Sequence, residues 1–81
     1  MRTVEYLPAA QRDLAAMPKQ DSAGMIAALD RFAETGAGDL RKLKGQRDRW
    51  ALRWGNWRAI YSPDGRIVRV LRVMDRKEVY R

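Results

Sequence analysis

Four side chains in the second half of the chain have the clearest chemical potential, because they could act together on a phosphate. They are Arg53, Arg58, Arg76 and Tyr80. A guanidinium matches the oxygens of a phosphate and can bind two of them at once. A phenol among positive charges is driven toward its ionised form, and its ring can stack on a base. A plainer alternative for Tyr80 is a hydrophobic anchor at the end of the chain.

The chain contains no histidine and no cysteine. Serine–histidine catalysis, imidazole acid–base pairs, disulfides and the usual structural zinc sites are therefore excluded. Phosphoryl transfer stays open, because it depends mainly on positioning and charge, and RNA supplies its own nucleophile, the 2′-OH. The base that takes the 2′-OH proton would be Tyr80, Lys42 or Lys44. The aspartates lack the spacing of a Mg²⁺ site, so we expect a metal-independent reaction without a cofactor.

The net charge of +7 is concentrated in one half of the sequence. Residues 1–40 hold four basic and six acidic side chains, whereas residues 41–81 hold thirteen basic and four acidic ones. This asymmetry favours a polyanionic partner, although a solvated basic surface would look the same. The candidates for contacts with an RNA backbone are Arg41, Lys42, Lys44, Arg47, Arg49, Lys77 and Arg81.

The first half of the sequence predicts one strand and two helices. Residues 3–6 are a short strand candidate, and Pro8 suits the first turn of a helix that Pro18 ends. A second helix would begin at an N-cap on Asp21 or Ser22. Its apolar residues recur with helical spacing up to Gly36, a natural stop.

The second half predicts a loop and three strands. Residues 36–49 are charged and punctuated by glycine, which is typical of a loop. Strands are predicted over residues 50–54, 57–62 and 67–74, with turns at 55–56 and 63–65 and no helix afterwards. The order β-α-α-β-β-β indicates a single α+β domain over residues 1–81. The helical hairpin would cover one face of a mainly antiparallel, twisted sheet.

The two-residue turn Gly55-Asn56 fixes the register of the hairpin around it. It places Arg53 opposite Arg58, and alternation puts both on the face that the tryptophans do not share. Like charges opposite one another destabilise a sheet, so the pair is a candidate phosphate clamp. The alternatives are two arginines extended into solvent, or an ion pair with Asp75 or Glu78.

Trp54 and Trp57 fall on the other face of the hairpin, together with Leu52 and Ala59. Packing against the helices is the favoured interpretation of this alternation, and base stacking by the two tryptophans is the alternative.

Export and membrane insertion find no support in the sequence. Charges interrupt the first fourteen residues, and no stretch approaches the ~18 apolar residues that span a bilayer. The absence of cysteine agrees with a reducing compartment, so we expect a cytoplasmic protein.

Together these features resemble the RelE/ParE toxin superfamily. The resemblance covers nearly the whole chain. It rests on the order of elements, the stretch KLKG at residues 42–45, the hairpin LRWGNWRAIY at 52–61 and the ending VMDRKEVY at 73–80. It implies a toxin of a bacterial toxin–antitoxin pair, with a cognate antitoxin that lays an acidic or amphipathic segment over the basic face.

Two activities follow from the resemblance. RelE-like members cleave mRNA in the ribosomal A site without metal and leave a 2′,3′-cyclic phosphate, whereas ParE-like members poison DNA gyrase. A basic RNA-binding module without activity is a third possibility.

The resemblance also implies roles for the candidate residues. Arg53 would be a basic residue of the first hairpin strand, Arg58 the phosphate-stabilising arginine and Arg76 the arginine past the last strand. Tyr80 would stack on the substrate base or help proton transfer. The chain departs from RelE at Ala51, where RelE has a lysine that is a candidate general base.

Overall fold

The computed structural model describes residues 1–79 of the chain, and the side chains of residues 1–77. The elements are β1 (Thr3–Tyr6), α1 (Pro8–Ala16), α2 (Lys19–Thr35), β2 (Asp39–Lys42), β3 (Trp50–Trp54), β4 (Trp57–Asp64), β5 (Ile67–Asp75) and α3 (Arg76–Val79).

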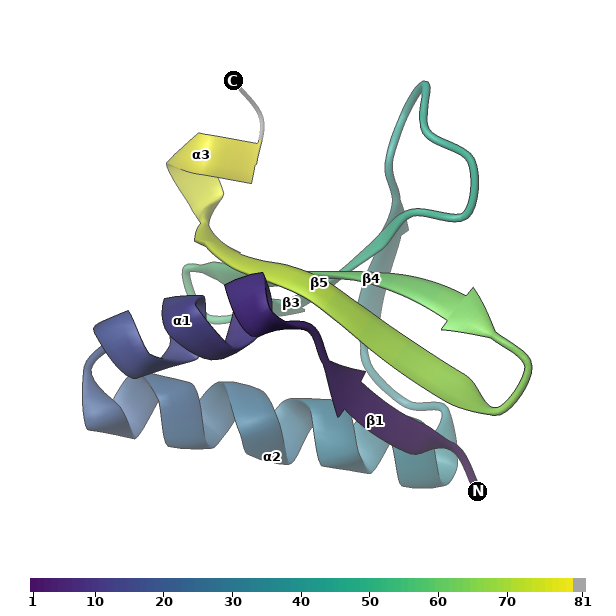
Figure 1. The fold of residues 1–81 in the computed structure, drawn as a ribbon, viewed down its shortest axis with the longest axis horizontal. Coiled ribbons are helices and arrows are strands. Elements are labelled where there is room, and N and C mark those ends of the chain that lie inside the picture. The colour runs from purple at the N-terminus through teal and green to yellow at the C-terminus, as the bar shows by residue number, and fades with distance from the viewer. Residues whose placement is uncertain (80–81) are drawn as a thin grey trace.

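The strands form one five-stranded sheet in the order β1-β5-β4-β3-β2. β1 pairs in parallel with β5, and the other neighbours are antiparallel. Helices α1 and α2 lie against one face of the sheet, whereas α3 and the loop after β2 rise from the other face (Figure 1). The predicted α+β class, with a helical hairpin on one face of a mainly antiparallel sheet, is confirmed.

The prediction of a loop over residues 36–49 was wrong in part, because this segment contains β2. Asp39 lies opposite Arg53 and Leu40 opposite Leu52. Leu40 is half-buried, whereas the three charged residues of β2 are exposed. A charged edge strand of this kind guards against pairing with other chains and leaves little apolar alternation to recognise.

Element ends differ from the predictions where backbone groups found other partners. α2 begins at Lys19 rather than after Asp21, because the carbonyl of Pro18 accepts the N–H groups of Asp21 and Ser22 at 2.9 and 3.0 Å. The predicted stop at Gly36 is confirmed, since this residue adopts a left-handed φ of 77°.

Two differences lie in the second half of the chain. β4 continues through Pro63 to Asp64, so the following turn is Gly65-Arg66 rather than residues 63–65. A short helix, α3, follows β5 where none was predicted. The Asp75 side chain accepts the N–H of Lys77 at 2.8 Å and so supports the first turn of α3.

The core lies between the sheet and α2. Its largest fully buried side chains are Met25, Leu29, Leu52, Val68 and Val70. The tryptophans of the hairpin pack against this core from the same face, as the favoured interpretation predicted.

Close packing joins α2 to the β3–β4 hairpin. A Cβ at Gly24 would overlap the ring of Trp54, so only glycine lets the helix come this close. The indole N–H of Trp57 donates to the carboxylate of Asp21 at 3.1 Å. These contacts hold the hairpin in one orientation on the helix.

Asp13 attaches α1 to the part of β5 that extends beyond its pairing with β1. Its carboxylate accepts the backbone N–H of Val73 at 2.9 Å and two hydrogen bonds from Arg72 at 2.7 and 3.1 Å. Burial on its own would raise the pKa of Asp13, but these hydrogen bonds and the charges of Arg72 and Arg12 outweigh it and lower the pKa. The ionised carboxylate therefore contributes to stability.

Candidate nucleic-acid interface

The hairpin places two arginines directly opposite each other. The register pairs Arg53 with Arg58 and Trp54 with Trp57, as the turn at Gly55-Asn56 predicted. Gly55 adopts a φ of 60°, which a two-residue hairpin turn requires and glycine supplies without strain. On the next strand Arg58 faces Met74. Both arginines therefore lie on the face of the sheet from which α3 and the β2–β3 loop rise.

Arg58 is buried rather than extended into solvent. It is only 5% exposed, so the alternative of an arginine extended into solvent is wrong for Arg58. Its Nη1 donates to the carbonyls of Trp57 at 3.0 Å and Gly55 at 3.4 Å, and its Nε is buried without a partner among the described residues. A guanidinium held in this way is preorganised and keeps unused hydrogen-bonding capacity.

Arg53 remains half-exposed at the edge of the same face. Its guanidinium lies 3.7 Å from the carboxylate of Asp39 on β2. An ion pair this long and exposed is weak, so Arg53 can turn toward an anionic ligand. The predicted alternative partner Asp75 is not used in this way, because the carboxylate of Asp75 accepts a backbone N–H of α3 instead. The sequence does not indicate Asp39 as this partner, because one leucine among the charged residues of β2 gives no strand pattern.

Arg76 and Lys77 begin α3 beside the hairpin turn. The backbone N–H of Arg76 donates to the carbonyl of Asn56 at 2.8 Å, which ties α3 to the turn. Both side chains are exposed. A hollow of about 380 Å³ lies between them, Asn56 and Asp75. The structure thus brings Arg76 to the end of the hairpin that carries Arg53 and Arg58.

The end of β2 and the β2–β3 loop together carry five of the predicted RNA-contacting cations, two on the strand and three in the loop. The N–H of Leu43 donates to the carbonyl of Arg49 at 3.0 Å and closes the loop at its base. Within the described part of the chain, none of these cations forms an ion pair with an acidic side chain: Arg41, Lys42, Lys44, Arg47 and Arg49. The loop encloses a hollow of about 400 Å³ and leaves its charges available to a polyanion.

The candidate bases lie apart from the arginines or outside the described residues. Lys42 pairs with Trp50, three residues along β3 from Arg53, which is about 10 Å at the rise of a strand. Tyr80 and Arg81 lie outside the residues that the structure describes, so their roles stay predictions. Among the side chains of residues 1–77, no three acidic ones gather as ligands for a metal ion. In the same range, no helix has the length and apolar character to cross a membrane.

A model of the ParE toxins of type II toxin–antitoxin systems matches residues 4–80. The chain belongs to the ParE toxin family. This ParE family member is accordingly a toxin of a type II toxin–antitoxin system, and the predicted resemblance to the RelE/ParE superfamily is confirmed. No curated protein matches it in sequence.

Solved toxin structures share the fold of this ParE family member. It aligns with a chain of the RelB–RelE antitoxin–toxin complex from Methanococcus jannaschii at a TM-score of 0.77 and 20% identity, covering 94% of each chain. The RelBE2 toxin–antitoxin complex from Mycobacterium tuberculosis gives 0.74 and 26%, covering 93% of this chain and 98% of that chain. The intact RelBE complex from E. coli gives 0.74 and 17%, covering 93% and 96%.

Proposed function

We propose that this toxin is a ribosome-dependent, metal-independent mRNA endoribonuclease. The observation that carries the proposal is the pair of opposed arginines. Arg58 is buried and keeps an unpartnered Nε, while Arg53 faces it across the hairpin and is held only weakly. A fold without an anionic ligand gains nothing from this opposition of charges. The cations of β2 and the β2–β3 loop would follow the RNA backbone, and those at the C-terminus, Lys77 and Arg81, would add to these contacts.

In the proposed reaction the 2′-oxygen attacks the adjacent phosphorus while the bond to the 5′-oxygen breaks. A base takes the 2′-OH proton and the departing 5′-oxygen gains a proton, so the products are a 2′,3′-cyclic phosphate and a 5′-OH end. Arg58 would stabilise the charge on the phosphate oxygens, with Arg53 and Arg76 beside it. Ala51 supplies no base, which leaves Tyr80, Lys42 at the end of β2 or Lys44 in the following loop for that step.

The direct test is cleavage of mRNA on purified ribosomes. Arg58→Ala should lower the cleavage rate by about 100-fold or more, because it removes a preorganised charge from the transition state. Arg31→Ala, which removes an exposed arginine from α2, is the matched control. EDTA should leave the rate unchanged, and the 3′ ends should carry cyclic phosphate. Undiminished cleavage by folded Arg58→Ala would contradict the mechanism.

Inhibition of DNA gyrase is the second candidate, and the match to the ParE toxin model favours it. A gyrase poison acts by protein–protein contact and needs no RNA-cleaving base, which suits the alanine at position 51. Accumulation of gyrase–DNA cleavage complexes in cells whose mRNA stays intact would select this activity and exclude the ribonuclease.

The partner of this toxin is proposed to be its cognate antitoxin. The three solved structures named above, which share its fold, are toxin–antitoxin complexes. The excess positive charge of residues 41–81 would attract an acidic antitoxin segment, which would order itself as it binds.

A further inference from the structure

An apolar cavity lies at the end of the sheet far from the Gly55-Asn56 turn. Its volume is about 300 Å³, and six apolar or aromatic side chains contribute most of its wall: Phe32, Leu40, Trp50, Tyr61, Ile67 and Val68. These come from α2 and from four different strands, so the wall is fixed by the core of the fold. A cavity of this size and lining suits one large apolar side chain.

One cation stands in this otherwise apolar cavity. The Arg2 guanidinium carbon lies 5.5 Å from the centre of the Phe32 ring. The backbone N–H of Arg2 donates to the carbonyl of Ala33 at 3.0 Å, which fixes its position beside the end of α2. Among the described residues, no carboxylate pairs with Arg2. Its charge is therefore available to an anion that enters the cavity.

The phenol of Tyr61 is a second polar group in the cavity wall. Burial raises the pKa of this phenol, and the charge of Arg2 partly opposes the rise, which agrees with their common position. The neutral phenol is a hydrogen-bond donor beside the guanidinium. A carboxylate could therefore be bound by both groups while an adjoining apolar group fills the cavity.

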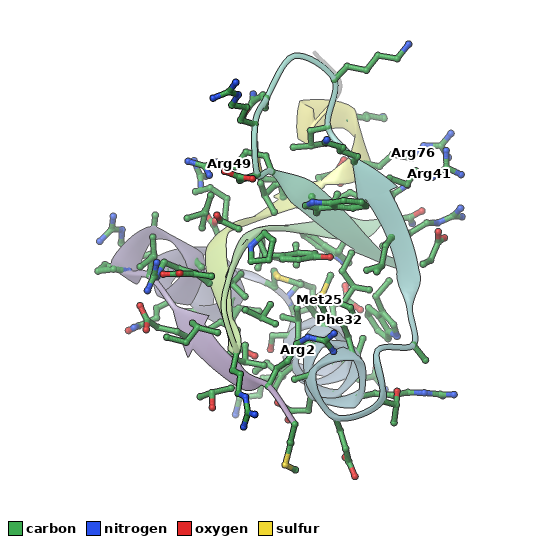
Figure 2. All side chains as sticks on the ribbon, turned by 90° about the vertical axis from the view of Figure 1, so that its right-hand side faces the viewer. Arg2, Met25, Phe32, Arg41, Arg49 and Arg76 are labelled. Carbon is green, nitrogen blue, oxygen red and sulfur yellow. The ribbon has the colours of Figure 1, made fainter. Side chains whose placement is uncertain are left out.

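Arg2 is the only cation among the described residues that line the cavity. Figure 2 looks onto this end of the molecule and shows Arg2 next to Phe32, whereas Arg41 and Arg49 lie further up, away from it. Leu40 lies opposite Leu52 of the core and Arg41 opposite Ala51, so alternation puts Arg41 on the other face of the sheet. The charge of Arg2 favours an acidic ligand, whereas the apolar wall offers no row of cations for a phosphate backbone.

We propose that this cavity, the Arg2 pocket, receives an apolar side chain from an acidic peptide segment whose carboxylate pairs with Arg2. The proposal rests on the proposed partner, since the segment would belong to the cognate antitoxin. The Arg2 pocket is separate from the candidate nucleic-acid interface around Arg58. Tyr61 lies in the core on the helix side of the sheet, and Arg58 lies on the opposite side. The antitoxin would thus be anchored away from the arginines of the hairpin.

The three tryptophans allow a direct test by NMR. Trp50 lines the pocket, whereas Trp54 and Trp57 lie at the other end of the hairpin. Overlapping peptides that tile the cognate antitoxin are titrated into ¹⁵N-labelled toxin. We expect one acidic peptide to shift the indole N–H signal of Trp50 and to leave the other two indole signals in place.

Variants of the pocket then test the two parts of the proposal. Arg2→Glu should weaken the affinity of that peptide by at least about tenfold, because like charges would meet in a desolvated site. Leu40→Phe, which fills the pocket without changing charge, should weaken it as well. Arg31→Glu makes the same charge change on the exposed side of α2. The affinity of this variant for the peptide should stay within about twofold of that of the original protein. Circular dichroism verifies folding, and Arg2→Gln replaces Arg2→Glu if the latter is unfolded.

Three results would overturn the proposal. In the first, no antitoxin peptide moves the Trp50 signal. In the second, Arg31→Glu weakens binding as much as Arg2→Glu, so that only net charge matters. In the third, a single-stranded RNA shifts Trp50 and the peptides do not. None of these measurements involves cleavage, so failure of the proposed ribonuclease activity would be seen separately.

Discussion

Arg58 combines a permanent charge with 5% exposure, in a protein that has acidic side chains available elsewhere. Burial of a guanidinium costs free energy, and among the described residues only two backbone carbonyls partly compensate it. The sequence could predict the position of Arg58 opposite Arg53, because the turn fixes the register. It could not predict the burial, which depends on how the other elements close over that face.

A prediction about stability follows from the burial of Arg58. The free energy of unfolding of Arg58→Leu should equal that of the original protein or exceed it by about 1 kcal/mol, because an apolar side chain of suitable size suits a buried site better. The same variant should lose ribosome-dependent cleavage. Urea unfolding and the cleavage assay measure the two effects. A loss of stability of several kcal/mol would show instead that Arg58 supports the fold.

Asp13 gives a residue-scale prediction with a defined pH dependence. Its pKa in the folded chain lies below the unfolded value, so its stabilising effect is complete above the unfolded pKa of about 4. The effect is lost as the pH falls through the lower, folded pKa. Asp13→Asn should cost about 1.5–3 kcal/mol at pH 7, since it weakens charged hydrogen bonds, and less at acidic pH.

Urea unfolding between pH 2 and pH 7 measures this difference. Glu34→Gln is the control, because Glu34 is exposed at the end of α2. A constant difference between Asp13→Asn and the original protein over the whole range would contradict the role assigned to the ionised carboxylate.

At the scale of elements, the sequence predicts those helices and strands that have a regular apolar period or a recognisable turn at their ends. Both long helices, β1 and the three strands after residue 49 were found, because each has a clear apolar period or a glycine at its end. β2 was missed because one leucine among charged residues gives no such period. α3 was missed because a single turn of helix depends on local contacts, here the carboxylate of Asp75.

The contact between α2 and the hairpin provides a test at this scale. Gly24→Ala should favour the helix by about 1 kcal/mol but collide with the ring of Trp54, which costs about 1–3 kcal/mol. The net result should be a less stable protein. In a Trp54→Phe background the smaller ring leaves room, so the same change should be neutral or stabilising.

A double-mutant cycle in urea measures this coupling between Gly24 and Trp54. Equal effects of Gly24→Ala in the two backgrounds would mean that the helix does not depend on a glycine at this contact.

At the scale of the whole molecule, we expect RNA to bind on the face of the sheet from which the cationic β2–β3 loop rises. Affinity for single-stranded RNA should fall as salt rises. Each phosphate contact removed from the β2–β3 loop should lower the slope of log K against log salt by about 0.7. Lys44→Gln and Arg47→Gln should therefore each reduce the slope. Lys19→Gln, at the start of α2 on the opposite side of the sheet, should not.

Fluorescence anisotropy over a range of salt concentrations measures the slope. Equal reductions by Lys19→Gln and Lys44→Gln would mean that net charge, rather than the loop, binds the RNA.

The parallel pairing of β1 with β5 joins residues 3–6 to residues 67–70. β5 also supplies the neighbour of β4, so it occupies an interior position in the sheet. During synthesis on the ribosome, β1 has no partner strand until β5 has emerged, and a contact between such distant segments forms slowly. The side of Arg58 that faces Met74 on β5 is consequently completed only after translation has passed residue 75.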